Sequence, residues 1–241
     1  MSVRYIFVLY YLFFACRIAA QTQPDGNKVR YTPDFKFRDG IYLNFDQVKA
    51  NKPIPKSRVL TSVEYNSNTF FEQITENEKF TYFDDLGNGQ EVAVGNIWGY
   101  CKNGILYIGI GSSFNRITIV GSICHFVANV TSYNSRYDNY GSYGYGYNPY
   151  GYGYNPYGYS PYGYSPYGYS PGYRTTELKQ FLLDFNTGKV LEYDNKNVEM
   201  LLMTDPELHD EYAGLRSKKK QQLRFMYIRK YNEKYPLFIP K

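Results

Sequence analysis

One apolar stretch, residues 91–131, constrains the fold of this chain more than any other feature. Its apolar, β-branched and aromatic residues are interrupted by three turn signals, Asn103-Gly104, Gly111-Ser112-Ser113 and Gly121-Ser122. Asn-Gly favours a two-residue type I′ turn, because both central positions of that turn need a positive φ. Apolar runs between such turns are typical of β-hairpins. The stretch therefore predicts the centre of an antiparallel sheet.

The same turns predict which residues face each other across the strands. Two-residue loops at 103–104, 112–113 and 121–122 align Cys101, Leu106, Ile119 and Cys124 in one cross-strand row. Side chains two residues apart share a face of a sheet. One face should therefore form core and gathers Ile97, Leu106, Ile108, Ile110, Ile117, Ile119 and Phe126. The other face carries a mixed set, Trp98, Tyr100, Lys102, Tyr107, Arg116, Thr118 and His125. A slip of one residue would exchange the two faces.

This register also bears on the cysteines. Cys101 and Cys124 would lie three strand spacings apart, which is roughly 14 Å. A disulfide needs Cα atoms within about 7 Å of each other. We therefore expect two buried, reduced thiols that pack as small apolar side chains.

The first twenty residues have the features of a secretory signal peptide. Arg4 supplies a positive start, residues 5–15 are apolar, and Ile18-Ala19-Ala20 precede a cleavage point before Gln21. An apolar run of this length is too short to span a bilayer, which takes about twenty residues. A minor alternative is a lipoprotein signal in which Cys16 is acylated. We expect export to the periplasm, the outer membrane or the extracellular space, and no transmembrane span in the mature chain.

Removal of this segment leaves about 220 residues, the size of one domain. Residues 21–40 are polar and are predicted to form a flexible leader. Residues 41–45, 58–65, 70–75 and 80–83 are predicted strands, and Asp46 is a candidate cap for a short helix ending before Pro53. The segment 84–89 has leucine and glycine where a calcium loop needs oxygen ligands, which favours a plain turn.

A low-complexity insertion occupies residues 133–173. Within it, residues 139–173 contain no charged residue, and Pro-Tyr-Gly-Tyr-Ser occurs three times from Pro156. Proline removes a backbone donor and glycine raises chain entropy, so neither helix nor sheet is expected. We expect a disordered surface loop. The alternative is a binding tract, because exposed tyrosines stack on sugars, aromatic rings or cations; its candidate contacts are Tyr150, Tyr157, Tyr162 and Tyr167.

Order is predicted to return at residue 174. Residues 175–185 and 189–193 are predicted strands joined by Asn186-Thr187-Gly188, so the insertion lies inside the sheet domain. Three helices should follow, the first starting at Asn195 or Asn197. Asp205 followed by Pro206 is a strong helix start, and Ser217 is a candidate cap for the last helix.

A cluster of lysines begins this last helix. Residues 214–241 hold nine Lys or Arg and one acidic residue. Lys218, Lys219 and Lys220 either form a solvated helix face or a docking surface for an envelope partner or for anionic lipid headgroups. The net charge falls from +5 to +3 when Arg4 and Arg17 leave with the signal, and the tyrosine tract has no cation, so nucleic acid is not an expected partner.

The sequence carries few residues suited to catalysis. His125 and His209 are the only histidines, and neither paired Cys-x-x-Cys ligands nor a His-x-x-x-His pair is present. Residues 109–114 fail the dinucleotide-binding fingerprint because residue 114 is Phe. In a predicted strand, His125 is expected to be a packed, hydrogen-bonded side chain. We therefore expect no cofactor and no enzymatic activity.

Four segments resemble known sequences. They are FRDGIYLNFDQVKANKP at 37–53, NIWGYCKNGILYI at 96–108, FNRITIVGSICHF at 114–126, and DPELHDEY with YIRKYNEKYPL at 205–237. Together they resemble uncharacterised secreted proteins of Bacteroidetes-type bacteria. The resemblance excludes the tyrosine tract, implies a location in the cell envelope and transfers no functional residue.

The combined expectation is an α+β protein: an antiparallel meander with a C-terminal helical cap and one disordered loop insertion. The domain should span residues 41–241. The leading function is a non-catalytic envelope protein that acts through surface contacts. The alternative is a glycan-binding module that uses the tyrosines of residues 139–173, and an enzyme is third.

Overall fold

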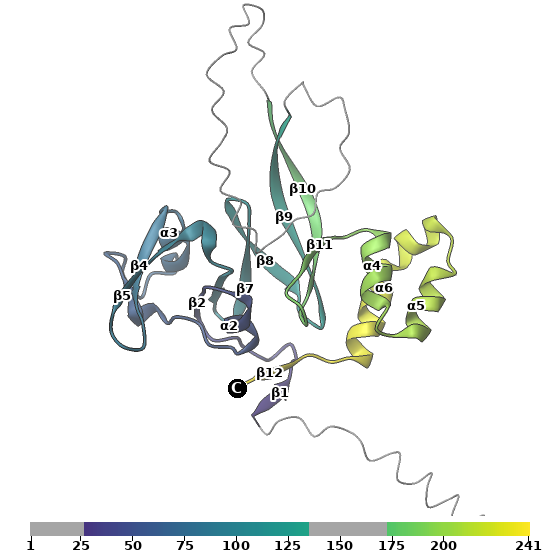
Figure 1. Cartoon of the computed structure of the whole chain (residues 1–241), viewed down its shortest axis with the longest axis horizontal. Coiled ribbons are helices and arrows are strands. Elements are labelled where there is room, and N and C mark those ends of the chain that lie inside the picture. Colours follow the sequence, from purple (N-terminus) through teal and green to yellow (C-terminus); the bar gives the residue numbers. More distant parts are fainter. Residues whose placement is uncertain (1–26, 135–172) are drawn as a thin grey trace, which may run out of the picture.

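The computed structural model describes residues 27–134 and 173–241. Its centre is an antiparallel seven-stranded sheet (Figure 1) with the order β11-β10-β9-β8-β7-β6-β2. From β6 to β11, strands that are consecutive in the sequence are also neighbours in the sheet, which confirms the predicted meander. Their bounds, with β2 at the edge, are β2 Gly40–Tyr42, β6 Gly99–Lys102, β7 Ile105–Ile110, β8 Ser113–Ile119, β9 Ile123–Asn134, β10 Tyr173–Asp184 and β11 Val190–Glu192.

The first predicted turn is confirmed and the second is displaced. Asn103 and Gly104 have φ values of 54° and 77°, and Cys101 pairs with Leu106. The next loop is at 111–112 rather than 112–113, because Ile110 pairs with Ser113. This changes the predicted pairing of β7 with β8 by two residues, an even number, so both strands keep their predicted faces.

Three residues depart from the predicted faces. The register between β8 and β9 shifts between residues 117 and 119, and Ile119 is 39% exposed rather than buried. Ile97 and Trp98 also exchange their expected environments, since Ile97 joins a different core and Trp98 packs against the expected one. Both precede β6, so the alternation of that strand does not extend to them.

The side chains of the sheet face three separate cores. The central core contains Cys101, Leu106, Ile108, Cys124 and Leu183. It is closed by helix α2, Phe45–Lys49, and by the two ends of the described chain. On the opposite face, Tyr100 and Tyr107 pack with helix α3, Phe70–Thr75, and with a small second sheet. Ile123 and Leu182 belong to a third core with the C-terminal helices. Neighbouring residues of β9 and β10 therefore contribute to two cores at once, as the pleat of a strand requires.

The small sheet consists of β3 Val59–Leu60, β4 Lys79–Phe83 and β5 Gly89–Ala93. Short 3-10 segments, Lys56–Arg58 and Val94–Asn96, flank it. The predicted strand at 70–75 is wrong, because Phe70–Thr75 forms helix α3. Ile74 lies one helical turn after Phe70 and Phe71, and all three side chains are buried. This tertiary packing overrides the strand preference of the aromatic residues.

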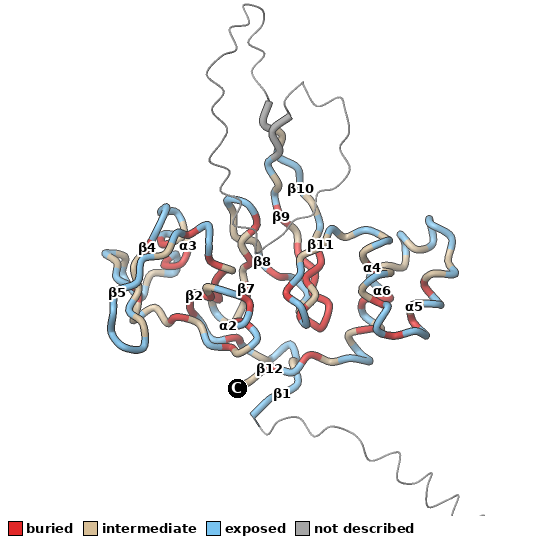
Figure 2. Tube along the Cα trace, viewed as in Figure 1, coloured by how far each residue is buried: buried red, intermediate tan, exposed pale blue. Residues whose placement is uncertain are grey.

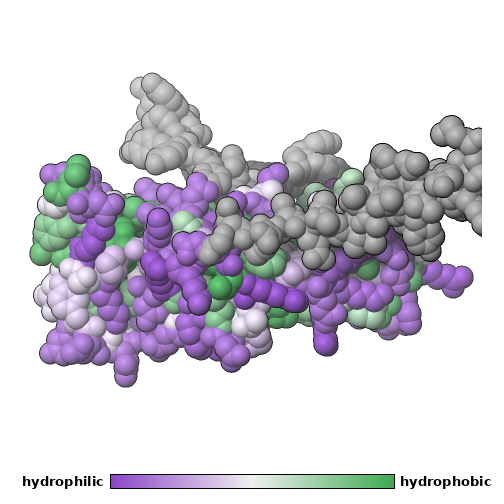
Figure 3. Space-filling model, turned by 90° about the horizontal axis from the view of Figure 1, so that it is seen from below, coloured by the Kyte–Doolittle hydropathy of each residue, from purple (hydrophilic) through white to green (hydrophobic). Residues whose placement is uncertain are grey.

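The rest of this sheet region also differs in detail from the prediction. The predicted strand at 58–65 is reduced to β3. The plain turn at 84–89 is confirmed, since Asp84 Oδ1 accepts the backbone N–H groups of Leu86 and Asn88, each at 2.9 Å. Figure 3 shows apolar surface at the end of the molecule that this sheet forms, where Leu60, Phe83 and Leu86 are exposed.

The segment expected to be a flexible leader is part of the fold from residue 27 onward. Strand β1, Lys28–Arg30, pairs with β12, Phe238–Pro240, and Phe37 is buried in the central core. The predicted leader was wrong here because its partner strand lies more than 200 residues away in the sequence. Helix α2, Phe45–Lys49, follows, and its cap is Asn44 rather than Asp46.

Three helices cap one side of the central sheet, as predicted (Figure 1). They are α4 Asn195–Leu202, α5 Pro206–Ala213 and α6 Ser217–Lys234. The Asp205 cap is confirmed, since its carboxylate accepts the Leu208 N–H at 3.2 Å. Ser217 is the first residue of α6 rather than its cap, a position that Arg216 takes without a side-chain hydrogen bond. Among the described residues, no helix is long and apolar enough to cross a membrane.

Candidate functional site

The long hairpin β9–β10 holds the two ends of the tyrosine insertion. Its twelve residue pairs run from Ile123 opposite Asp184 to Asn134 opposite Tyr173. The distal part extends beyond the neighbouring strands (Figure 1), and burial decreases along it from the base outward (Figure 2). Leu178 on this arm is 73% exposed. The candidate contacts Tyr150, Tyr157, Tyr162 and Tyr167 lie outside the described residues, as does Cys16.

The three predicted lysines occupy two different environments. Lys218 and Lys219 are exposed in the first turn of α6. Lys220 points the other way: its Nζ lies 2.6 Å from Glu199 Oε2 on α4 and 5.5 Å from the centre of the Tyr212 ring. Its side chain is only 16% exposed. The structure therefore brings two of the three cations together as an accessible pair and assigns Lys220 to the packing between helices.

His125 is packed where α6 lies on the sheet. Its Nε2 is 3.0 Å from Gln180 Oε1, and its ring centre is 4.7 Å from that of Phe225 and 5.2 Å from that of Tyr193. Burial lowers the pKa of His125, and the hydrogen bond to Gln180 partly offsets this. This confirms the expected packed, hydrogen-bonded histidine.

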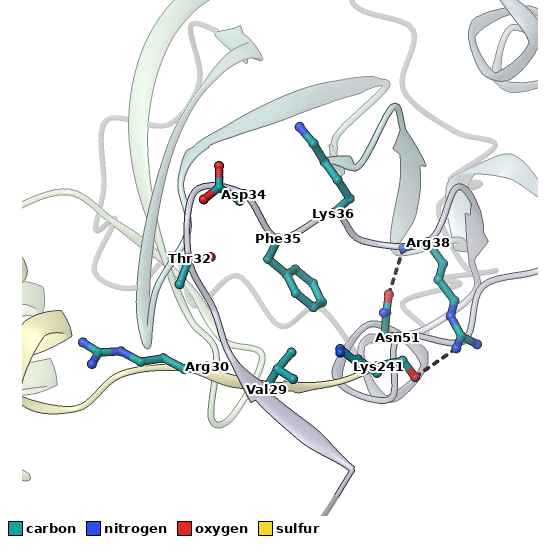
Figure 4. A pocket seen from close by; sticks show the side chains of 9 residues that line it. All are labelled: Val29, Arg30, Thr32, Asp34, Phe35, Lys36, Arg38, Asn51 and Lys241. Atoms are coloured by element: carbon teal, nitrogen blue, oxygen red, sulfur yellow. Dashed lines mark hydrogen bonds between the residues drawn. The ribbon is translucent and has the colours of Figure 1, made fainter.

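A cationic pocket lies between the first and last described segments of the chain. Its volume is about 460 Å³. Val29 and Phe35 point into its middle (Figure 4). The cations Arg30, Lys36, Arg38 and Lys241 also line it, and the charged ends of Arg30 and Lys36 are directed away from the Phe35 ring. Asp34 is the only acidic residue in its lining. We call this site the β1 pocket.

Asn51 holds the frame of the β1 pocket together. It adopts the left-handed conformation, with φ at 51°, and is 2% exposed. Its Oδ1 accepts the Arg38 N–H at 2.9 Å and the Tyr42 O–H at 3.2 Å, and its Nδ2 donates to the Pro240 carbonyl at 3.2 Å. One side chain thus joins the segment 31–38, strand β2 and strand β12.

The sequence prediction missed this pocket. Its lining combines residues 29–38 and 51 with residue 241, and no local pattern indicates that these segments meet. The only signal was the high number of cations in the supposed leader, where Lys28, Arg30, Lys36 and Arg38 fall within eleven residues. Side chains around a ligand site come from distant segments as a rule.

The part of the chain that the structure describes contains no group of three or more His, Cys, Asp and Glu side chains that could hold a metal ion. Comparison of the chain with protein-family models, with curated proteins and with solved structures finds no match.

Proposed function

We propose that this chain is an exported, non-catalytic envelope protein that acts through surface contacts, with the tyrosine tract as its principal contact. The observation that carries the proposal is the β9–β10 hairpin. It joins the two ends of the tract at its tip and extends beyond the neighbouring strands (Figure 1). A folded domain that carries such an arm can present an insertion at a distance from its own core.

The base of the arm is anchored firmly enough for this role. Cys124 and Leu183 are buried in the central core, while Ile123 and Leu182 are buried in the helical core. An isolated two-stranded hairpin is only marginally stable, so these two anchors account for the ordered arm. The entropic cost of closing a loop rises only slowly with the length of the loop. The tract can therefore be shortened or lengthened with little effect on the stability of the fold.

The chemistry of the tract and the packing of His125 support the non-catalytic reading. Tyrosines spaced by glycine and proline offer stacking and hydrogen-bonding groups without charge. His125 is enclosed by Phe225 and Tyr193, which leaves its ring poorly placed for proton transfer to a substrate. The partner we propose is another envelope protein. Lys218 and Lys219 add a second, weaker contact for an acidic partner or an anionic membrane surface.

The experiment compares three forms of the protein in its native cells. In the first variant, residues 139–172 are replaced by a short Gly-Ser loop, which leaves strand β10 intact. In the second, Tyr150, Tyr157, Tyr162 and Tyr167 become serine, which keeps the length of the tract. Chemical crosslinking of intact envelopes, followed by mass spectrometry, measures the partners of each form.

We expect both variants to keep a melting temperature within a few degrees of the wild type and to lose the crosslinked partner. If the Gly-Ser variant captures the same partner in the same amount, the tract is not the contact. If no protein partner is found and the wild type binds a glycan array through the same tyrosines, the alternative of a glycan-binding module replaces the proposal.

A further inference from the structure

We propose that the β1 pocket binds a small organic anion, a carboxylate or phosphate attached to a flat apolar group. This site is independent of the tyrosine tract and of the lysines on α6. The pocket volume of about 460 Å³ lies within the range of about 300–1,000 Å³ that is usual for small-molecule sites.

The charge of the lining selects an anion. Among the described residues, Arg30, Lys36 and Lys241 have no side-chain ion-pair partner, and Arg38 uses one guanidinium nitrogen to donate to the main-chain oxygen of Lys241 at 2.9 Å. Asp34 is the one residue of the lining with a carboxylate side chain. Cations gathered around a hollow raise the local concentration of anions, and guanidinium groups match the geometry of carboxylate and phosphate oxygens.

The apolar side chains in the middle of the pocket favour a ligand that carries an apolar group. Phe35 and Val29 point into it (Figure 4). The ring of Phe35 is itself fixed by Tyr31 and Phe37, whose ring centres lie 5.9 Å and 5.2 Å away. Flat groups pack favourably against such a ring. A free inorganic ion would use the cations and leave this apolar surface uncovered.

The walls of the site are held in place by hydrogen bonds within the protein. The Tyr31 N–H donates to the Leu237 carbonyl at 2.7 Å, the Phe35 N–H closes a turn onto Thr32 at 2.9 Å, and Asn51 joins the remaining segments. The stem of Lys36 lies over the β6–β7 turn at Gly104, where an added Cβ would meet it at 2.5 Å. Groups that are ordered beforehand lose less entropy on binding.

The test uses isothermal titration calorimetry of the purified protein at low salt, with phenyl phosphate, benzoate and inorganic phosphate as probes. We expect at least one of the two organic anions to bind with a Kd of about 1 mM, and inorganic phosphate to bind several-fold more weakly. Either order of phenyl phosphate and benzoate supports the proposal and identifies the acidic group. Binding should weaken as salt is added, because exposed charges are screened over about 8 Å at physiological ionic strength.

Variants locate the binding. Lys36→Gln and Arg38→Gln should each reduce the affinity for the organic anion about fivefold. Lys218→Gln, which removes the same charge from α6, should change that affinity less than twofold. Phe35→Leu should remove the preference for the organic anion over inorganic phosphate. Melting temperatures of all variants verify that they are folded.

Three results would overturn the inference. The first is an absence of binding by every probe at about 10 mM, where a millimolar site would be mostly filled. The second is equal affinity for phenyl phosphate and inorganic phosphate. The third is an affinity that Lys36→Gln and Lys218→Gln reduce equally, which would indicate adsorption to the basic surface as a whole.

Discussion

Replacement of Asn51 by alanine should destabilise the protein far more than the same change at Asn103. These are the only described residues other than glycine with a positive φ, 51° and 54°. They differ in what the side chain does. Asn51 is buried and joins three segments through its amide, whereas Asn103 is exposed in the two-residue turn between β6 and β7.

The expected magnitude follows from two contributions. Alanine tolerates the left-handed conformation less well than asparagine, at a cost of about 1 kcal/mol at either position. At residue 51 the change also removes hydrogen bonds to the Arg38 N–H and the Pro240 carbonyl, at about 1 kcal/mol each. The Tyr42 hydroxyl keeps a second partner, the Arg38 carbonyl at 3.0 Å, and is not counted. The unfolding free energy should therefore fall by about 3 kcal/mol at Asn51 and by about 1 kcal/mol at Asn103.

Urea unfolding measures both values, with the fluorescence of the single tryptophan as the signal. Trp98 lies beside Tyr42 and Phe45, with ring centres 6.4 Å and 6.0 Å away, close to the segments that Asn51 joins. Glycine at residue 51 removes the backbone cost and should recover about 1 kcal/mol relative to alanine. If the two alanine variants differ by less than about 0.5 kcal/mol, the hydrogen bonds of Asn51 contribute little and the reasoning is wrong.

Three more predictions concern other parts of the molecule. Burial lowers the pKa of His125, so the unfolded chain binds a proton at this residue more readily than the folded chain does. The unfolding free energy should therefore fall as the pH drops below about 6.5. Urea unfolding at pH 7.5 and at pH 5 should show a smaller loss of stability between the two pH values for a His125→Gln variant than for the wild type. Reversal of charge at Lys218 should change stability by less than about 1 kcal/mol, while reversal at Lys220, which faces Glu199, should lower it by more than that. Cys101 and Cys124 are buried and free, and burial raises the pKa of both thiols, so alkylating reagents should modify neither in the folded protein and both after denaturation; a linked peptide pair would contradict this.

The sequence by itself was sufficient to predict the features that depend on a few adjacent residues. Asn103-Gly104 specifies a turn because it accepts two positive φ values, and that turn placed Cys101 opposite Leu106. Asp205 and Pro206 start a helix because the carboxylate satisfies a free N–H and proline needs none. The alternation of apolar residues then predicted the central core face of β6, β7 and β8 almost completely, and it survived a displaced turn because the displacement was even.

Only the tertiary structure decided what depends on segments far apart in the chain. Phe70–Thr75 has the composition of a strand, but a helix buries Phe70, Phe71 and Ile74 against the small sheet. The polar sequence of residues 27–40 predicts no regular structure, but β1 pairs with β12 from the other end of the described chain. Lys220 is part of a basic run in the sequence, and only the position of Glu199 on another helix removes it from the surface. The β1 pocket exists for the same reason: Asn51 joins residues 38 and 240 through an amide whose partners no local pattern could specify.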